Sequence, residues 1–466
     1  MTSRPVSRKV TADLLARYDR PGPRYTSYPT AVEFTAGVDA ALYEERLAEA
    51  NRLAEAPLSV YMHLPFCEAR CHFCGCHVII SPQKEKSAPY LDLLHREIEL
   101  VSSRLQDRRK VSQLHLGGGT PTYFSPDQLG QLIRRFLERF ELTSDAEVAV
   151  EADPRVTTEA HLETLTELGF NRISMGVQDF TPRVQEAIGR HQTLEQAARL
   201  VELARARNFS GINIDLIYGL PHQTPESFEQ TVKTAIELRP DRLAVYSFAY
   251  VPWIKSGMKK LDQQAFPDRD TKFELFGIAR EGFLNAGYEP IGMDHFALPL
   301  DELSIAKRAG RLRRNFQGYS VIPAEDVIGL GISAIGDVRG AYVQNVKKLS
   351  EYQNVLAEDR LPVDRGIARS PDDEVRRDVI HQLMCNFKVS IPEIERAHRI
   401  RFAEYFAEDL RRLRLEEREG LVRIDEQGIE ATATGELFVR NLALCFDRYW
   451  REKHENDDQP IFSRTV

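Results

Sequence analysis

The sequence predicts an α/β protein built around a partial (β/α)6 barrel, with an N-terminal extension and a mostly helical, winged-helix-like C-terminal domain. From residue 58 onwards, short apolar runs alternate six times with amphipathic stretches of helical length. The apolar runs are almost continuous, which is typical of parallel strands covered by helices on their faces. The 466 residues also exceed what one ordinary core accommodates.

Each unit of the barrel consists of an apolar run followed by a helical pattern. The strands are expected at 58–64, 111–119, 147–153, 172–178, 212–220 and 242–250. The helices are expected at about 87–106, 126–139, 157–168, 181–189, 193–207 and 225–238. Since such barrels carry their chemistry at the C-terminal ends of the strands, residues at these ends are the first candidates for function.

Three regions divide the chain: an N-terminal extension at 1–56, the barrel domain with its C-terminal elaboration at 57–375, and a C-terminal domain at 376–466. In the extension, the proline-rich segment 20–31 cannot form a continuous helix. Within 251–375, only 327–337 shows a clear pattern, which indicates a strand and a glycine turn.

The C-terminal domain combines helices with one hairpin. Helices are expected at roughly 374–386, 391–398 and 402–417, followed by a hairpin at 421–432 and a last helix from Gly435 to about Arg451. This order resembles a winged helix, but acidic and basic residues are nearly balanced and no helix has a clear basic face. We therefore expect a helical cap on the barrel and not a DNA-binding module.

Composition narrows the class of protein further. The net charge of −8 argues against nonspecific binding of nucleic acid. No apolar run approaches the length of a membrane span, and the N-terminus lacks the apolar region of a signal peptide. We expect a cytoplasmic protein, and a monomer because no self-association seam is evident. In a reducing compartment, a tight group of thiols indicates metal or redox chemistry and not disulfides.

Four of the six cysteines lie close together, at Cys67, Cys71, Cys74 and Cys76. Their spacing leaves three kinds of site open: structural zinc, an iron–sulfur cluster with four thiolate ligands, or a cluster held by three. A zinc site usually uses two C-x-x-C pairs, and no second pair exists here. Cys76 is too close to Cys74 for both to reach different corners of one cubane easily. Three thiolates would leave one iron open to a small molecule.

Polar residues gather near the other strand ends. The run 116–122 contains three glycines, which let a ligand approach the backbone, although a tight strand-to-helix turn is the alternative. Asp215 lies in an apolar strand, where a lone carboxylate is costly unless it is paired or functional. Glu151 could accept hydrogen bonds from ribose hydroxyls, or it could pair with Arg172 or Arg190.

Tyr61 and His63 share one face of the first predicted strand, directly before the cysteine loop. A core histidine is an equally good explanation of His63. Gln178 and Arg190 are ordinary polar residues that gain interest only from their position at strand ends.

The stretch CEARCHFC (67–74) has the C-x-x-x-C-x-aromatic-C pattern of radical S-adenosylmethionine (SAM) enzymes. Together with GPRYTSYPTA, HLGGGTPTY, EADPR, SMGVQDF, NIDLIYGLPHQT and GLGISAIG, it makes nearly the whole chain resemble the oxygen-independent coproporphyrinogen III oxidases of bacterial haem biosynthesis. Two features separate that family from its shorter haem-chaperone relatives: the PRYTSYPT segment and the additional cysteine, here Cys76. Both are present.

The resemblance implies specific roles for residues of this chain. It implies a [4Fe–4S] cluster on Cys67, Cys71 and Cys74, whose open iron chelates SAM. It places a first SAM at Tyr61, Gly118, Glu151 and Ile335. It places a second SAM at Phe73, Gly119, Thr120, Gln178, Arg190, Asp215 and Ala249. Our candidates for a direct part in the reaction are Tyr61, His63 and Cys76, and we do not expect Cys76 to be a cluster ligand.

The implied reaction converts two propionate side chains of coproporphyrinogen III into vinyl groups, giving protoporphyrinogen IX. A radical derived from SAM removes a hydrogen from the β-carbon, CO₂ is lost, and one electron passes to an acceptor. The cluster also needs an electron donor, and the sequence identifies neither donor nor acceptor. Alternatives on the same scaffold are a haem chaperone and a haem-modifying radical SAM methyltransferase. The alternative without this chemistry is a zinc-stabilised α/β protein.

The implied substrate carries four carboxylates, so basic residues are expected in its pocket. Arg24 in the N-terminal extension is one candidate. The arginine-rich segment 308–320 is another, with a solvated charged helix as the alternative explanation.

Overall fold

A twelve-stranded sheet forms the centre of the computed structural model, which describes residues 10–322, 324–455 and 461–465. Six neighbouring strands of this sheet are parallel and follow each other in chain order. They are β1 (Leu58–Leu64), β4 (Lys110–Gly118), β5 (Glu141–Ala152), β6 (Arg172–Gln178), β7 (Gly211–Tyr218) and β8 (Arg242–Ser247). The predicted fold class is therefore confirmed.

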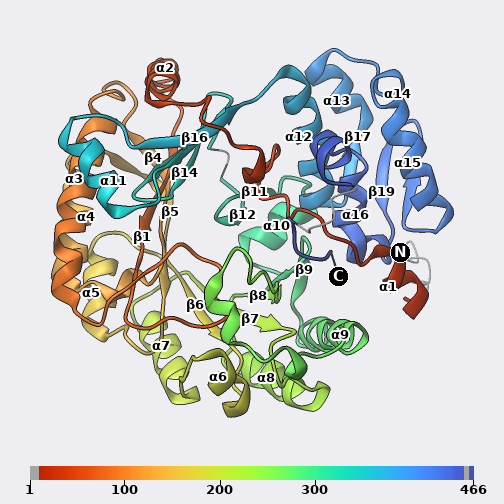
Figure 1. Cartoon of the computed structure of the whole chain (residues 1–466), viewed down its shortest axis with the longest axis horizontal. Coiled ribbons are helices and arrows are strands. Elements are labelled where there is room, and N and C mark those ends of the chain that lie inside the picture. The colour runs from red at the N-terminus through yellow and green to blue at the C-terminus, as the bar shows by residue number, and fades with distance from the viewer. Residues whose placement is uncertain (1–9, 323, 456–460, 466) are drawn as a thin grey trace.

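Helices cover the outer side of the curved sheet (Figure 1). They are α3 (Ala88–Ser102), α4 (Pro126–Leu137), α5 (Glu159–Glu167), α6 (Pro182–Ile188), α7 (Leu194–Ala206) and α8 (Pro225–Glu237). Four of them begin with a capping box, at Ser125, Thr158, Thr193 and Thr224. This motif satisfies two amide donors at the helix start and fixes where the helix begins. Within the described ranges, no helix has both the length and the apolar character needed to cross a membrane.

Strands added at both edges extend the parallel centre. Beside β1 lie β13 (Val327–Leu330), which is parallel to it, and then β14 (Ile335–Val338), β15 (Ala341–Asn345) and β16 (Val363–Ala368), which are antiparallel. Beside β8 lie the antiparallel β10 (His295–Ala297) and β9 (Glu289–Ile291). The predicted strand and glycine turn at 327–337 correspond to β13 and the turn into β14. In the described chain β9 and β16 form the two ends of the sheet, so the barrel is partial.

Several elements carried no clear signal in the sequence. They are α1 (Ala12–Tyr18), α2 (Ala40–Asn51), α9 (Arg269–Asn285), α10 (Glu302–Arg308) and α11 (Leu349–Ala357). The solvated charged helix considered for 308–320 is wrong beyond Arg308. This segment forms a hairpin of β11 (Arg313–Asn315) and β12 (Gly318–Ser320), because Arg314 is drawn inwards over the Tyr319 ring, 4.6 Å from its centroid.

The C-terminal domain has the predicted helices and hairpin. They are α12 (Pro371–Asn386), α13 (Ile391–His398), α14 (Phe402–Tyr405), α15 (Ala407–Arg418), β18 (Val422–Ile424) and β19 (Gly428–Ala431), with β17 (Lys388–Ser390) added to the hairpin. The predicted last helix is interrupted: a 3-10 turn precedes α16 (Val439–Leu444), and a π-helical turn follows at Trp450–His454. The boundary predicted between 375 and 376 falls inside α12.

The N-terminal extension packs into two different cores. Leu14 and Tyr18 of α1 belong to the hydrophobic core of the C-terminal domain, whereas Tyr43 and Leu47 of α2 belong to the core of the barrel. Figure 1 shows α1 beside the C-terminal helices. Buried Arg440 of α16 donates hydrogen bonds to carbonyls of the segment that follows α1. The extension therefore ties the two larger regions together.

A buried ion pair joins three parts of the barrel domain. The guanidinium of Arg108, after α3, lies 2.5 Å from the carboxylate of Asp326, which precedes β13. Both side chains are almost completely buried. Arg108 also donates to the backbone carbonyls of Ala50, Ala56 and Pro57, at the end of α2 and before β1. The pair thus fixes the starts of β1 and β13. The cysteine loop follows the other end of β1.

Replacing Asp326 by Asn should destabilise the protein strongly, because it leaves the Arg108 guanidinium buried without a counter-charge. We expect the free energy of unfolding to fall by about 3–5 kcal/mol, measured by urea denaturation. Glu55→Gln, which removes an exposed ion pair to Lys110, is the matched control and should leave the unfolding midpoint unchanged. Equal, small effects of both substitutions would contradict the importance of the buried pair.

Candidate active site

A cavity of about 430 Å³ lies at the C-terminal ends of the barrel strands. Most of the residues predicted from the sequence line it: Cys67, Cys71, Phe73, Cys74, Cys76, Gly118, Gly119, Thr120, Glu151, Gln178, Arg190 and Asp215. Tyr61, His63, Ala249 and Ile335 are not in this lining. The parallel strands thus bring together residues that are up to about 150 positions apart in the chain, as strand ends in such barrels do.

The cysteine loop leaves and returns at one place. Cys67 belongs to the short strand β2 (Phe66–Cys67), which pairs with β3 (Ile79–Ile80) beyond the loop. The Cys67 Sγ lies 3.4 Å from the hydroxyl of Thr120, and burial raises the pKa of this thiol to about 11. Cys76 lies beside Cys74, and its hydrogen bonding lowers the pKa of the Cys74 thiol. Thiol ligands bind metal only as thiolates, so this loop would release protons on loading.

Among the described residues, no three His, Cys, Asp or Glu side chains converge on one single-ion position. A single zinc ion would require such convergence. A cubane cluster does not, because each thiolate binds a different iron atom. Thiols at Cys67, Cys71 and Cys74 on one wall of the cavity therefore fit a cluster in their chemistry and placement better than one ion.

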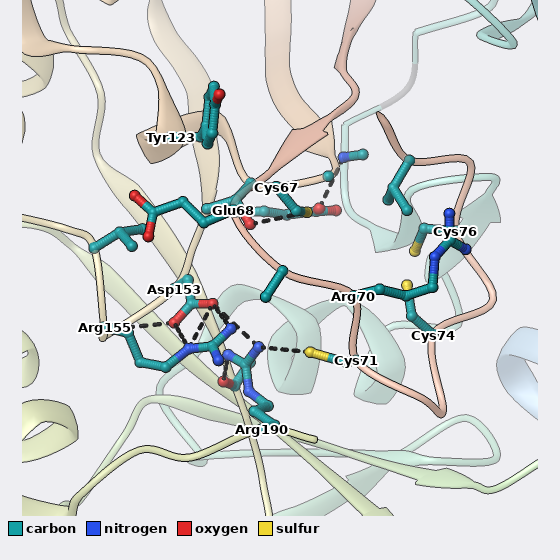
Figure 2. A pocket seen from close by; sticks show the side chains of 18 of the residues that line it. Cys67, Glu68, Arg70, Cys71, Cys74, Cys76, Tyr123, Asp153, Arg155 and Arg190 are labelled. Atoms are coloured by element: carbon teal, nitrogen blue, oxygen red, sulfur yellow. Dashed lines mark hydrogen bonds and ion pairs between the residues drawn. The ribbon is translucent and has the colours of Figure 1, made fainter. Parts of the chain in front are cut away.

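An ion-pair network stands next to Cys71 (Figure 2). The guanidinium of Arg190 lies 3.7 Å from the Cys71 Sγ and 3.1 Å from the carboxylate of Asp153. Arg155 contacts the same carboxylate at 2.6 Å. Burial opposes the charge of Asp153, but the two arginines hold its pKa below the ordinary value. Our sequence reasoning did not assign roles to Asp153 and Arg155, although the EADPR stretch that contains them was recognised.

Glu151 enters the cavity as an ionised carboxylate. The ring of His115 lies 3.3 Å from one of its oxygens, and the Gly118 amide donates to the other at 3.0 Å. Burial works against the charge, yet these hydrogen bonds hold the pKa below its ordinary value. The pairing with Arg172 or Arg190 that we considered does not occur, since Arg172 pairs with other carboxylates and Arg190 with Asp153.

Asp215 has the opposite electrostatic setting. Its carboxylate accepts hydrogen bonds from Asn213 at 2.7 Å and from Ser174 at 3.4 Å, both of which are neutral. Burial raises the pKa of Asp215 to about 6. The cavity therefore holds two different carboxylates. Glu151 stays ionised at neutral pH, whereas Asp215 loses its proton only near pH 6.

Two buried polar atoms at the cavity have no hydrogen-bond partner within the described chain: Gln178 Oε1 and Arg190 Nε. Buried polar atoms are nearly always satisfied, so these atoms indicate a polar ligand. Gln178 also has a left-handed backbone, with a φ of 72°, which is costly for a residue other than glycine. The donors and acceptors fit the ribose and amino-acid groups of SAM.

The glycine run is required by packing between strands. A Cβ on Gly118, whose φ is +117°, would lie 2.6 Å from the ring of His63. A Cβ on Gly119 would lie 2.5 Å from the backbone of Pro65. Close packing against β1 and the segment that follows it therefore accounts for the missing side chains. Both glycines nevertheless line the cavity, so their backbone faces a ligand as well.

His63 lies behind the cavity wall and uses both ring nitrogens. Its Nε2 donates to the carbonyl of His77 at 2.9 Å, and its Nδ1 accepts from the Tyr61 hydroxyl at 3.0 Å. Burial lowers the pKa of His63 to about 4, so the ring is neutral. His63 supports Gly118 from behind and Tyr61 lies against Gly117. Ile335 lies at the start of β14, and Ala249 follows β8.

The buried carboxylate of Glu97 fixes the turn between β13 and β14. Glu97 of α3 accepts hydrogen bonds from Tyr352 at 2.5 Å, from the Gly331 amide at 2.6 Å and from Asn345 at 2.6 Å. Beside it, the Tyr90 hydroxyl donates to the carbonyl of His63 at 2.7 Å. Burial raises the pKa of Glu97 to about 7 in spite of these bonds.

Comparison with known proteins gives consistent matches. Residues 61–235 match the radical SAM superfamily and residues 370–438 match the HemN C-terminal domain. The chain is 45% identical to the oxygen-independent coproporphyrinogen III oxidase of Escherichia coli, over 97% of this chain and 98% of that protein. It is 40% identical to the oxidase of Synechocystis, over 98% of both. The solved structure of coproporphyrinogen III oxidase (HemN) from Escherichia coli, described as a radical SAM enzyme, aligns with a TM-score of 0.88. That alignment has 45% identity and covers 91% of this chain and 97% of the other.

The titration of Glu97 should be visible in the stability of the protein. Because its folded-state pKa is raised above 4.5 to about 7, its contribution is fully present below pH 4.5 and is lost as the pH rises through 7. We expect the Glu97→Gln variant to gain roughly 3 kcal/mol relative to the natural protein between pH 4.5 and 8, in urea unfolding at each pH. Glu281→Gln, on the exposed side of α9, is the control. A stability difference that stays constant with pH would refute this reading of Glu97.

Proposed function

Because the chain belongs to the family of oxygen-independent coproporphyrinogen III oxidases in the radical SAM superfamily, we propose that it decarboxylates two propionate side chains of coproporphyrinogen III to vinyl groups. The product is protoporphyrinogen IX, the next compound of haem biosynthesis. The observation that carries this function is the full-length similarity, together with a cysteine loop that lines the cavity at the strand ends.

We propose that Cys67, Cys71 and Cys74 hold the [4Fe–4S] cluster of this family. Together, the bound cluster and SAM would provide an oxidant that can remove hydrogen from carbon, and this oxidant would come from reductive cleavage of SAM. The guanidinium of Arg190 lies 3.7 Å from the Cys71 Sγ, so its positive charge would face the negative charge of a bound cluster. Asp153 keeps Arg190 in this position and is itself held by Arg155.

The first SAM is proposed to lie against Gly118 and Glu151. The ionised carboxylate of Glu151 can accept hydrogen bonds from ribose hydroxyls, and His115 fixes its orientation. We propose that Tyr61 and His63 act by supporting Gly117 and Gly118, respectively, from behind. Ile335 is proposed to contact the same SAM, and the Glu97 network would position the turn before it.

A second SAM is proposed at the other side of the cavity, where the unpartnered atoms of Gln178 and Arg190 lie. Asp215, with its raised pKa, stands in the same wall. The remaining candidate contacts are Phe73, Gly119, Thr120 and Ala249. Apolar side chains in the lining would keep water from the reacting groups, at Phe73, Val78 and Ile80.

Arg24 and the segment 308–320 are the candidates for binding the substrate carboxylates. Arg24 donates a 2.6 Å hydrogen bond to the Ser247 carbonyl at the end of β8, which favours a role in attaching the extension. In the segment 308–320, Arg308 pairs with Glu289 and Arg314 with Asp294. We propose that the enzyme works in the cytoplasm as a monomer. An external electron donor and acceptor complete the reaction.

An anaerobic turnover assay tests the function. The reconstituted protein is incubated with SAM, a low-potential reductant, cell extract as electron acceptor and coproporphyrinogen III, and the tetrapyrrole and 5′-deoxyadenosine are followed by mass spectrometry. We expect loss of two CO₂ units per substrate. Cys71→Ser should abolish it and lower the iron content, whereas Cys445→Ala, in the core of the C-terminal domain, should retain iron and turnover. Haem binding without any turnover would instead indicate a chaperone.

A separate experiment tests whether Cys76 is a cluster ligand. Its side chain lies beside Cys74, so it cannot readily serve a second corner of the cluster. Cys76→Ser should therefore retain the iron and sulfide content of the natural protein. If Cys76 takes part in the reaction, its loss should lower turnover roughly 10²-fold, measured by product formation under single-turnover conditions. Loss of iron to the level of Cys71→Ser would make Cys76 a ligand and contradict the proposal.

A further inference from the structure

The outer side of the cysteine loop carries a surface that the cavity does not use. We propose that this surface docks a small acidic electron-carrier protein, which delivers the electron that the cluster needs. We call it the carrier surface, and it consists of Arg70, Trp253, Ile254, Lys255, Lys259 and Lys260. The proposal rests on the proposed function, because only a redox enzyme of this kind requires such a carrier.

Two large apolar side chains stand at the centre of the carrier surface. Trp253 is 56% exposed and Ile254 is 57% exposed. The loop that bears them is nevertheless anchored, since Met258 and Leu261 are 3% and 4% exposed. An anchored loop that buries two apolar residues and leaves a tryptophan and an isoleucine outside is typical of a binding surface. Tryptophan is also enriched at the energetic centres of protein interfaces.

Four positive charges lie on the same loop or in contact with it. The Lys255 ammonium lies 3.3 Å from the backbone carbonyl of Cys76, and Arg70 packs against Gly257 of the same loop. Lys259 and Lys260 follow on the 3-10 helix Ser256–Lys260 and are exposed. Within the described chain, none of these four cations forms an ion pair of 4 Å or less with a carboxylate. The chain as a whole has a net charge of −8, so this local excess of positive charge selects an acidic partner.

Apart from Arg70, the carrier surface lies outside the cavity, next to the cysteine loop. Cys71, Cys74 and Cys76 line the cavity, whereas Trp253, Ile254 and Lys255 do not. Arg70 reaches both sides, and Figure 2 shows it next to Cys74 and Cys76. Cys76 itself is exposed. A protein on the outer side therefore comes within one loop of the cluster ligands while SAM and the substrate occupy the inner side.

The redox step is simple in its balance. The reduced centre of the carrier gives up one electron and is oxidised, and the cluster accepts that electron and is reduced. No bond forms or breaks between the two proteins. Complexes of this type are short-lived and small, with less than about 1,200 Å² of buried surface. Two apolar side chains inside a rim of four cations match such a small, electrostatically guided contact.

The tetrapyrrole substrate is the competing occupant, because it is also apolar and carries carboxylates. It must reach the inner side of the loop to react, and Trp253 and Ile254 do not line that cavity. The location of the apolar centre therefore favours the carrier over the substrate.

Binding is measured first, with a purified acidic [2Fe–2S] ferredoxin as the probe and the holoenzyme as the partner. The chain has two tryptophans, and Trp450 is only 6% exposed, so a ferredoxin-induced change in tryptophan fluorescence reports on Trp253. We expect the dissociation constant of the Lys259→Glu/Lys260→Glu variant to rise about tenfold at low salt, and the difference to shrink as salt is added. Lys388→Glu, on the exposed side of the C-terminal domain, is the matched control.

Turnover is measured next with two reductants. Reduced ferredoxin should support about tenfold less turnover in the double variant, whereas dithionite, which needs no docking surface, should support the natural rate. An equal loss with both reductants and unchanged ferredoxin binding would overturn the proposal and assign the surface to the substrate. Unchanged binding and unchanged turnover would overturn it as well. A natural protein that is inactive with dithionite would refute the proposed function, while the binding measurement would still decide the docking surface.

Discussion

The site depends on the position of β1 between two parallel neighbours. On one side β1 pairs with β4, with His63 opposite Gly117 and Leu64 opposite Gly118. On the other side it pairs with β13, with Met62 opposite Leu330. Parallel strands end at the same edge, so the cysteine loop, the glycine run and the β13–β14 turn all meet there. The close approach of these segments leaves no space for side chains on Gly118 and Gly119. A change at this junction would disturb every part of the cavity at once.

The electrostatics of the cavity come from pairing some carboxylates and leaving others without a cation. Asp153 is held between Arg155 and Arg190 and therefore stays charged next to Cys71. Glu151 obtains its charge from hydrogen bonds with His115 and the Gly118 amide. Asp215 has only neutral partners, and its pKa rises to about 6. Glu151 and Asp153 therefore stay ionised as the pH falls, whereas Asp215 takes up a proton near pH 6.

The parts of the fold that could be predicted are those governed by local pattern. The six barrel strands and their helices follow from apolar periodicity and capping residues such as Thr158 and Thr193. The antiparallel strands at the edges are short and held by distant partners, so local pattern does not identify them. The arginine-rich segment 308–320 resembled a charged helix because the sequence does not show that Arg314 is buried over Tyr319. Most of the predicted site residues were chosen from motifs, and the structure places twelve of them in the lining of one cavity. Asp153 and Arg155 belong to an ion-pair network that spacing alone does not reveal.

The division of the cysteine loop into an inner and an outer side follows from the same junction. Because β2 pairs with β3, the loop between them is closed at its base and projects as a single layer over the strand ends. A single layer has only two sides, and the strand ends occupy one of them. The loop after β8 lies against the other, where Lys255 binds the Cys76 carbonyl. If the carrier docks as proposed, the thickness of one loop separates electron entry from substrate entry, and both can proceed without either partner leaving.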